Sequence, residues 1–162
     1  MPESNIQNFN HLKIHSQFSI CEGAIKIDDL KEVAKEKKIK SLGLCDTSNL
    51  CGALEFAEKI SKSGTQPIIG TQINFKFGDT IGLIPLFALS EVGYKKIIEL
   101  SSLSYLSNDG TTEPHLNFEE LIKRNDGVSV FSGTIFGFAP DSPNIPWIRS
   151  SGRICCRSAA TF

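Results

Sequence analysis

The stretch FNHLKIHS at residues 9–16 alternates apolar and polar side chains, which is the pattern of a half-buried strand. Because successive side chains of a strand point to opposite faces, Leu12 and Ile14 lie on one face. The other face carries His11, Lys13 and His15. Two of the three histidines in the chain therefore share one side. An apolar side that packs on a helix and a polar side that ends at a site indicate an α/β fold, although histidines are also common on ordinary exposed strands.

Composition places the chain among ordinary globular proteins. It has 162 residues, of which 40% are hydrophobic and 22% are charged, and this is enough for one domain with a real core. A net charge of -1 provides no general positive field for a nucleic-acid backbone. Any contact with nucleic acid must therefore be local or belong to parts outside this chain.

Cysteine usage and hydropathy indicate the compartment. The five cysteines are odd in number and show no C-x-x-C spacing, which argues against a disulfide framework or a cysteine zinc site. The start of the chain has neither a basic n-region nor an apolar h-region, and no run of about 18 apolar residues occurs. The sequence therefore predicts a protein of the reducing cytoplasm that does not enter a membrane.

Helical periods recur downstream of the first predicted strand. Residues 27–38 have an apolar stripe, acids in the first turn and lysines in the last, which predicts a helix. A second helix is predicted between a cap at Thr47 or Ser48 and a stop at Gly64, and a third after a cap at Ser90. The side chains expected to face inward on these helices are Ile27, Leu30, Val33 and Ala34; Leu50, Ala53, Leu54, Ala57 and Ile60; and Tyr94, Ile97, Ile98 and Leu103.

Strand periods alternate with these helices. The further strands are predicted at residues 41–46, 66–75, 83–89 and 128–133. A capping box of Asn117 and Glu120 predicts one more short helix. This alternation indicates a parallel sheet or a (β/α) barrel, whose functional groups gather at the C-terminal ends of the strands. The polar residues at or near such ends are His15, Asp46, Gln72 and Ser132.

The two ends of the chain differ from the middle. Residues 138–162 hold three of the seven prolines, the one tryptophan and a pair of adjacent cysteines, without apolar periodicity. We expect an irregular tail there, either disordered or artefactual. Residues 1–8 are a lead, which leaves residues 9–137 as the domain.

Five blocks of sequence carry a resemblance. They are HLKIHSQFSICEGA, LGLCDTSNLCGALEFA, QPIIGTQINF, FALSEVGYKKIIELSSLSYL and GVSVFSG. In order and spacing they closely resemble the N-terminal PHP (polymerase and histidinol phosphatase) domain of the bacterial replicative DNA polymerase III alpha subunit, over residues 8–137. The resemblance implies the first part of a distorted (β/α)7 barrel, incomplete because the chain is truncated.

The same resemblance implies a setting. The rest of the polymerase alpha chain would follow, with DNA and Mg²⁺ held by domains that this chain lacks. Through the holoenzyme, the implied partners are the proofreading exonuclease subunit and the sliding clamp. No membrane partner is implied.

The metal ligands of active PHP domains can be compared residue by residue. Their His-x-His on the first strand falls at Lys13 and His15, their Asp-His pair after the second strand at Asp46 and Thr47, and their Glu on the third strand at Gln72. A protonated lysine cannot coordinate a metal, and threonine and glutamine are poor ligands for zinc or manganese. Only His15 and Asp46 remain as ligands, with His11 nearby.

We therefore interpret these positions as a vestigial metal site without catalytic residues, in which the ammonium of Lys13 supplies the positive charge that a metal would give Asp46. No cofactor is expected in this chain. The alternative is an active PHP-type phosphoesterase or 3'-5' exonuclease with zinc or manganese. That alternative needs ligands at Lys13, Thr47 and Gln72, whereas the first interpretation makes the chain a structural and docking domain of a DNA-directed DNA polymerase.

Overall fold

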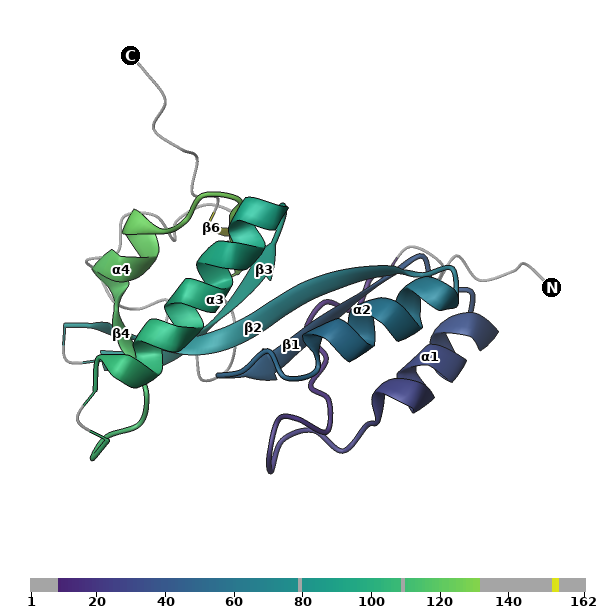
Figure 1. The fold of residues 1–162 in the computed structure, drawn as a ribbon, viewed down its shortest axis with the longest axis horizontal. Helices are drawn as coiled ribbons and strands as arrows, with labels where there is room; N and C mark the ends of the chain where they lie inside the picture. The colour runs from purple at the N-terminus through teal and green to yellow at the C-terminus, as the bar shows by residue number, and fades with distance from the viewer. Residues whose placement is uncertain (1–8, 79, 109, 132–152, 155–162) are drawn as a thin grey trace, which may run out of the picture. The chain divides into compact units, whose positions relative to one another are not determined.

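The computed structural model describes residues 9–78, 80–108, 110–131 and 153–154 (Figure 1). Helices and strands are mixed along this part of the chain, as the sequence predicts. In chain order they are α1 (Ile27–Glu36), β1 (Ser41–Thr47), α2 (Ala53–Lys62), β2 (Gln66–Phe77), β3 (Thr80–Ala88), α3 (Glu91–Leu106), β4 (Leu116–Asn117), α4 (Phe118–Lys123), β5 (Val128–Phe131) and β6 (Arg153–Ile154). Ser132, the lead at 1–8 and all of the predicted tail except residues 153–154 lie outside the described residues.

The chain divides into two compact units, which are described separately here. The first takes the described residues up to Asp46 and those from Leu50 to Gly70, and the second takes 47–49 and the described residues from Thr71 onward. Strand β2 therefore contributes its first residues to one unit and the remainder to the other.

In the first unit, the stretch quoted above runs beside β1 but does not form the predicted strand. Gly43 N donates to His11 O at 2.7 Å and Cys45 N donates to Ile14 O at 2.8 Å. Ile14 also forms an isolated parallel bridge with Leu44. At Ser16 the backbone N–H donates instead to a side chain, the carboxylate of Asp46, at 2.6 Å. The parallel direction is as expected, but the continuous strand at residues 9–16 is a wrong prediction.

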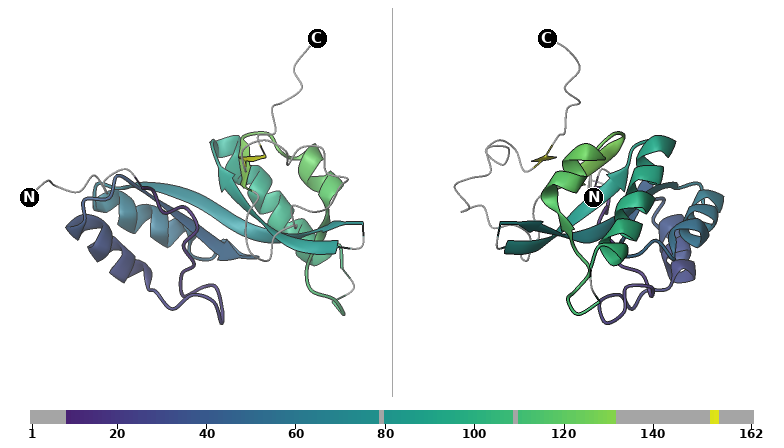
Figure 2. Two further views of the ribbon diagram at one scale, coloured as in Figure 1. Left: turned by 180° about the vertical axis from the view of Figure 1, so that it is seen from behind. Right: turned by 60° about the vertical axis from the view of Figure 1, so that its left-hand side comes forward.

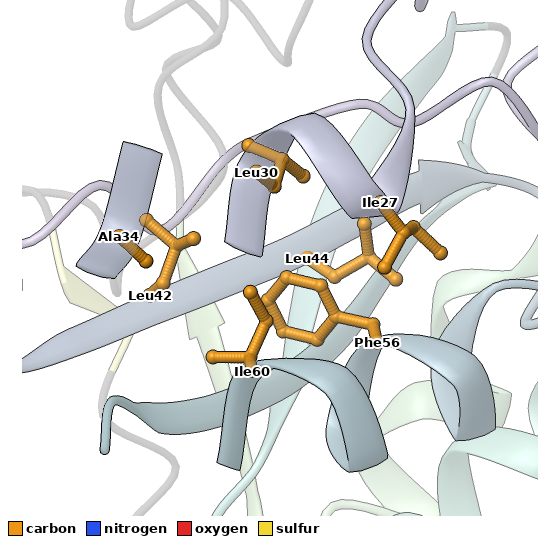
Figure 3. Packing of buried hydrophobic residues seen from close by; sticks show 7 residues of the cluster. All are labelled: Ile27, Leu30, Ala34, Leu42, Leu44, Phe56 and Ile60. Carbon is orange, nitrogen blue, oxygen red and sulfur yellow. The ribbon is translucent and has the colours of Figure 1, made fainter. Parts of the chain in front are cut away.

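The core of this unit is built from both helices and β1. Helices α1 and α2 pack against each other, and their side chains point toward those of β1 (Figure 3). The buried cluster consists of Ile27, Leu30, Ala34, Leu42, Leu44, Phe56 and Ile60. Two predicted inward residues, Val33 and Leu54, are exposed instead. The inward face of α2 follows Ala53, Phe56 and Ile60, a spacing of three and then four residues. Leu54 lies about 100° around the helix from Ala53, on the side away from Phe56 and Ile60.

Helix α2 also begins later than predicted. Its N-cap is Gly52, which makes no side-chain cap bond, rather than Thr47 or Ser48. A Cβ on Gly52 would lie 2.8 Å from the ring of Phe18 and 3.3 Å from Oδ2 of Asp46. Close packing at this position therefore excludes the side chain that a usual N-cap supplies. The predicted stop is correct, because Gly64 follows the helix with φ +81°.

The second unit contains a mixed sheet. Strands β2 and β3 are neighbours joined by only two residues, and such a short connection requires an antiparallel hairpin. Strand β5 is antiparallel to β3, with Leu86 opposite Val130, and β4 is parallel to β2. Of the two predicted alternatives, these antiparallel pairs contradict a wholly parallel sheet, whereas the predicted α/β class is confirmed.

Helix α3 lies along β3, as the views in Figure 2 also show. Ser90 caps it as predicted, with Oγ accepting from Gly93 N at 3.2 Å. The helix approaches the turn before β5 so closely that a Cβ on Gly93 would lie 1.8 Å from Gly127 O. Ile97 is buried as predicted, whereas Ile98 is exposed and Leu100 takes the inward place. Among the described residues, none of the helices has the length and apolar character that crossing a lipid bilayer requires.

The core of the first unit gives a direct test on a single helix. Phe56 of α2 is 0% exposed and Leu54 is 72% exposed. Phe56→Ala should lower the free energy of unfolding by about 3–5 kcal/mol, because it removes a buried ring and leaves a cavity. Leu54→Ala, the matched control, should change it by no more than about 0.5 kcal/mol. Urea unfolding of both variants measures the difference, and equal losses would contradict the packing in Figure 3.

Candidate functional site

Asp46 lies near the end of β1 and is buried, with 1% of its surface exposed. Its carboxylate accepts three hydrogen bonds from two serines. Ser16 donates its N–H to Oδ1 at 2.6 Å and its hydroxyl to Oδ2 at 2.7 Å. The hydroxyl of Ser19 donates to Oδ1 at 2.7 Å. Both serines are buried, so these bonds are shielded from water.

Neither serine stands out in the sequence as a candidate site residue. Ser16 is the last residue of the quoted stretch and Ser19 lies in the turn that follows it, where serine is common and usually exposed. The only available signal was the spacing of three residues between Ser16 and Ser19, which lets both hydroxyls face one acceptor when the chain turns. Serine spacing of this kind occurs in many turns, so it identifies no partner without the fold.

The histidine and lysine positions of the predicted site also lie in the first unit. The side chain of His15 is 22% exposed, and its Nδ1 lies 3.8 Å from Oε2 of Glu22. Within the described residues, this buried Nδ1 makes no hydrogen bond. His11 is exposed, and its ring lies edge-on to that of Phe9, with the ring centroids 4.8 Å apart. Lys13 is exposed as well.

Thr47 and Gln72 belong to the second unit, where they contact each other. Gln72 Nε2 donates to Thr47 Oγ1 at 2.7 Å, and Ser48 N donates to Gln72 O at 2.8 Å. Gln72 is 2% exposed, and its Oε1 has no hydrogen-bond partner among the residues that the structure describes. Side-chain amide and hydroxyl groups thus stand at the two positions that the sequence resemblance pairs with a Glu and a His.

The donor set can be tested against a metal centre. Zinc and manganese sites require several imidazole, thiolate or carboxylate ligands around one point. In the part of the chain that the structure describes, no three His, Cys, Asp or Glu side chains are grouped closely enough to hold a metal ion. The carboxylate of Asp46 instead accepts hydrogen bonds from serines. These residues do not fit a zinc or manganese centre.

Cys45 precedes Asp46 on β1 and is buried. Burial raises the pKa of its thiol to about 12, from an ordinary value of 9.0. The negative charges of Asp46 and Glu22 also raise this pKa, and the positive charge of Lys13 opposes them. The thiol therefore stays neutral, which makes it a poor nucleophile and a poor metal ligand.

The raised pKa of Cys45 predicts selective alkylation. In native protein at about pH 8.5, iodoacetamide should modify the exposed Cys21 and leave Cys45 unmodified until the chain is unfolded, because only the thiolate reacts. Because the folded-state pKa lies above 9.0, the contribution of this thiol to stability is complete below pH 9 and declines as the pH rises toward 12. Peptide mapping by mass spectrometry measures each site, and native modification of Cys45 at the rate of Cys21 would contradict the burial.

Comparison with known proteins adds the family. The family model described as "PHP domain" matches residues 11–142. DNA polymerase III subunit alpha of Rickettsia felis is 40% identical over 121 residues, which cover 74% of this chain and 10% of that protein. The same subunit of Caulobacter vibrioides is 36% identical over 141 residues, covering 82% of this chain and 12% of that protein.

A solved structure of an amidohydrolase from Chromobacterium violaceum is also similar, with a TM-score of 0.45, 15% identity, and coverage of 64% of this chain and 40% of that one. The chain spans about a tenth of the length of the polymerase subunits that it matches. The family model covers most of the chain and agrees with the resemblance found in the sequence. This chain belongs to the PHP domain family.

Proposed function

We propose that this chain is the PHP segment of a replicative DNA polymerase III alpha subunit and that it has a structural and docking role without catalysis of its own. Identity of 31–40% to polymerase alpha subunits over most of the chain supports the first part. One observation carries the second part. Lys13, Thr47 and Gln72 stand at three ligand positions of active PHP domains, and none of them suits zinc or manganese.

The chemistry of the proposed parent protein belongs elsewhere in its chain. Nucleotide addition, Mg²⁺ binding and DNA binding would reside in polymerase domains that these residues do not include. A net charge of -1 agrees with a segment that does not itself hold DNA. The proposed partners are the rest of the alpha chain, the proofreading exonuclease subunit and the sliding clamp, all in the bacterial cytoplasm.

We also propose that Lys13 supplies part of the positive charge that a metal would give. Lys13 and Asp46 act in opposite directions on the pKa of the same thiol, Cys45, which supports their lying in one electrostatic neighbourhood. Because Lys13 is exposed, water and salt screen its charge. Its effect on stability is therefore small compared with that of a buried ion pair.

The absence of catalysis is tested by metal retention. After incubation with zinc or manganese and desalting, the protein should keep well under one equivalent of metal, because too few ligands are grouped together, and it should not hydrolyse a generic phosphoester. Atomic absorption and a colorimetric phosphatase assay provide the readings. The proposal fails if metal is kept stoichiometrically and turnover is present but disappears in His15→Ala.

The role of Lys13 is tested by its salt dependence. Lys13→Met should lower the free energy of unfolding by less than about 1 kcal/mol at low salt, and the loss should vanish in about 1 M salt, where charges are screened. Lys40→Met is the matched control, because Lys40 is also exposed and precedes β1 at the end opposite to Asp46. Denaturant unfolding of both variants at two salt concentrations measures the loss of unfolding free energy. Equal losses in the two variants would contradict the proposed role of Lys13.

A further inference from the structure

We propose that Asp46 is a structural clamp that holds the loop at residues 16–25 through hydrogen bonds from Ser16 and Ser19. The supporting observation is the set of three hydrogen bonds from Ser16 and Ser19 to its two carboxylate oxygens. This inference shares with the proposed function only the premise that Asp46 is outside a metal cluster.

Burial explains why the carboxylate needs these partners. An ionised carboxylate away from water is costly unless charges or hydrogen bonds compensate it. It offers about four acceptor positions, and Ser16 and Ser19 use three of them. The distances of 2.6–2.7 Å are those of charge-assisted hydrogen bonds, which are stronger than neutral ones. The serines thus occupy most of the acceptor positions of the buried carboxylate.

The same serines organise the loop. The hydroxyl of Ser16 accepts from Phe18 N at 3.2 Å while it donates to Asp46, so it links the loop backbone to the carboxylate. Ser19 N donates to Ser16 O at 2.9 Å, and Gly23 N donates to Ser19 O at 2.9 Å. The chain then returns so closely that a Cβ on Gly23 would lie 2.0 Å from Ser16 O. The position of Asp46 therefore sets the course of the loop on both sides of Ser19.

The loop also joins two parts of the core. It begins beside β1, where Ile14 bridges Leu44, and ends before α1, which starts at Ile27. Gln17 N donates to Ile25 O at 3.0 Å, so the two arms of the loop are paired with each other. A loop anchored at both arms and clamped through its serines should resist opening without any bound ion.

Hydrogen exchange of the full chain tests the clamp. In Asp46→Ala, peptides covering residues 16–25 should exchange on the order of tenfold to a hundredfold faster, because the buried donors of Ser16 and Ser19 lose their acceptor. Asp46→Asn should give a smaller increase, since its amide oxygen can still accept from Ser16 N and the Ser19 hydroxyl. Ser104→Ala is the control, because Ser104 is also buried but, among the described residues, its hydroxyl bonds only to Ser101 O within α3.

A chelator distinguishes the clamp from a metal site. EDTA should leave exchange at residues 16–25 of the unmodified protein unchanged. The clamp is overturned if EDTA accelerates exchange there as much as Asp46→Ala does, or if Asp46→Ala leaves exchange unchanged. Should Asp46→Ala fail to fold, Ser19→Ala removes a single donor and should still accelerate exchange in this loop relative to Ser104→Ala. These readings are independent of metal retention and hydrolysis, so the clamp and the proposed absence of catalysis can fail separately.

Discussion

A buried carboxylate at the end of a strand must be compensated, and this requirement shapes the first unit around Asp46. Its side chain follows Cys45 directly and is shielded from water, with 1% of its surface exposed. Hydrogen bonds from Ser16 and Ser19 compensate the buried carboxylate. Because Ser16 N–H donates to this side chain, it is not used for pairing with β1. The loop that leads to α1 therefore follows from the electrostatics of one side chain.

The hydrophobic core of that unit is compatible with the same constraint. Leu42 and Leu44 of β1 bury their side chains against α1 and α2, while Gly43 lets the chain near Leu12 approach, since a Cβ there would lie 2.4 Å from Leu12 O. Gly52 likewise leaves space beside Oδ2 of Asp46. Small residues at these two places allow polar and apolar contacts to coexist within a few ångströms.

Membership of the PHP family and the proposed departure from its metal chemistry are consistent with each other. Among the described residues, the buried positions that build the core are mostly apolar. Metal ligands are few and can be exchanged without loss of the core, provided that the buried polar groups find other partners. Gln72 and Thr47 hydrogen-bond to each other in the second unit, and Asp46 is bonded to serines in the first.

Local patterns in the sequence determined much of this protein, because they depend on neighbours a few residues away. The alternation of helices and strands, the Ser90 cap, the Gly64 stop and the family could all be read from the chain itself. Tertiary structure decided the rest. Burial of Phe56 rather than Leu54 depends on which side of α2 meets β1, and the hairpin of β2 and β3 depends on pairing across the sheet. The partners of Asp46 lie 27 and 30 residues before it, and only the folded chain brings their hydroxyls to its carboxylate.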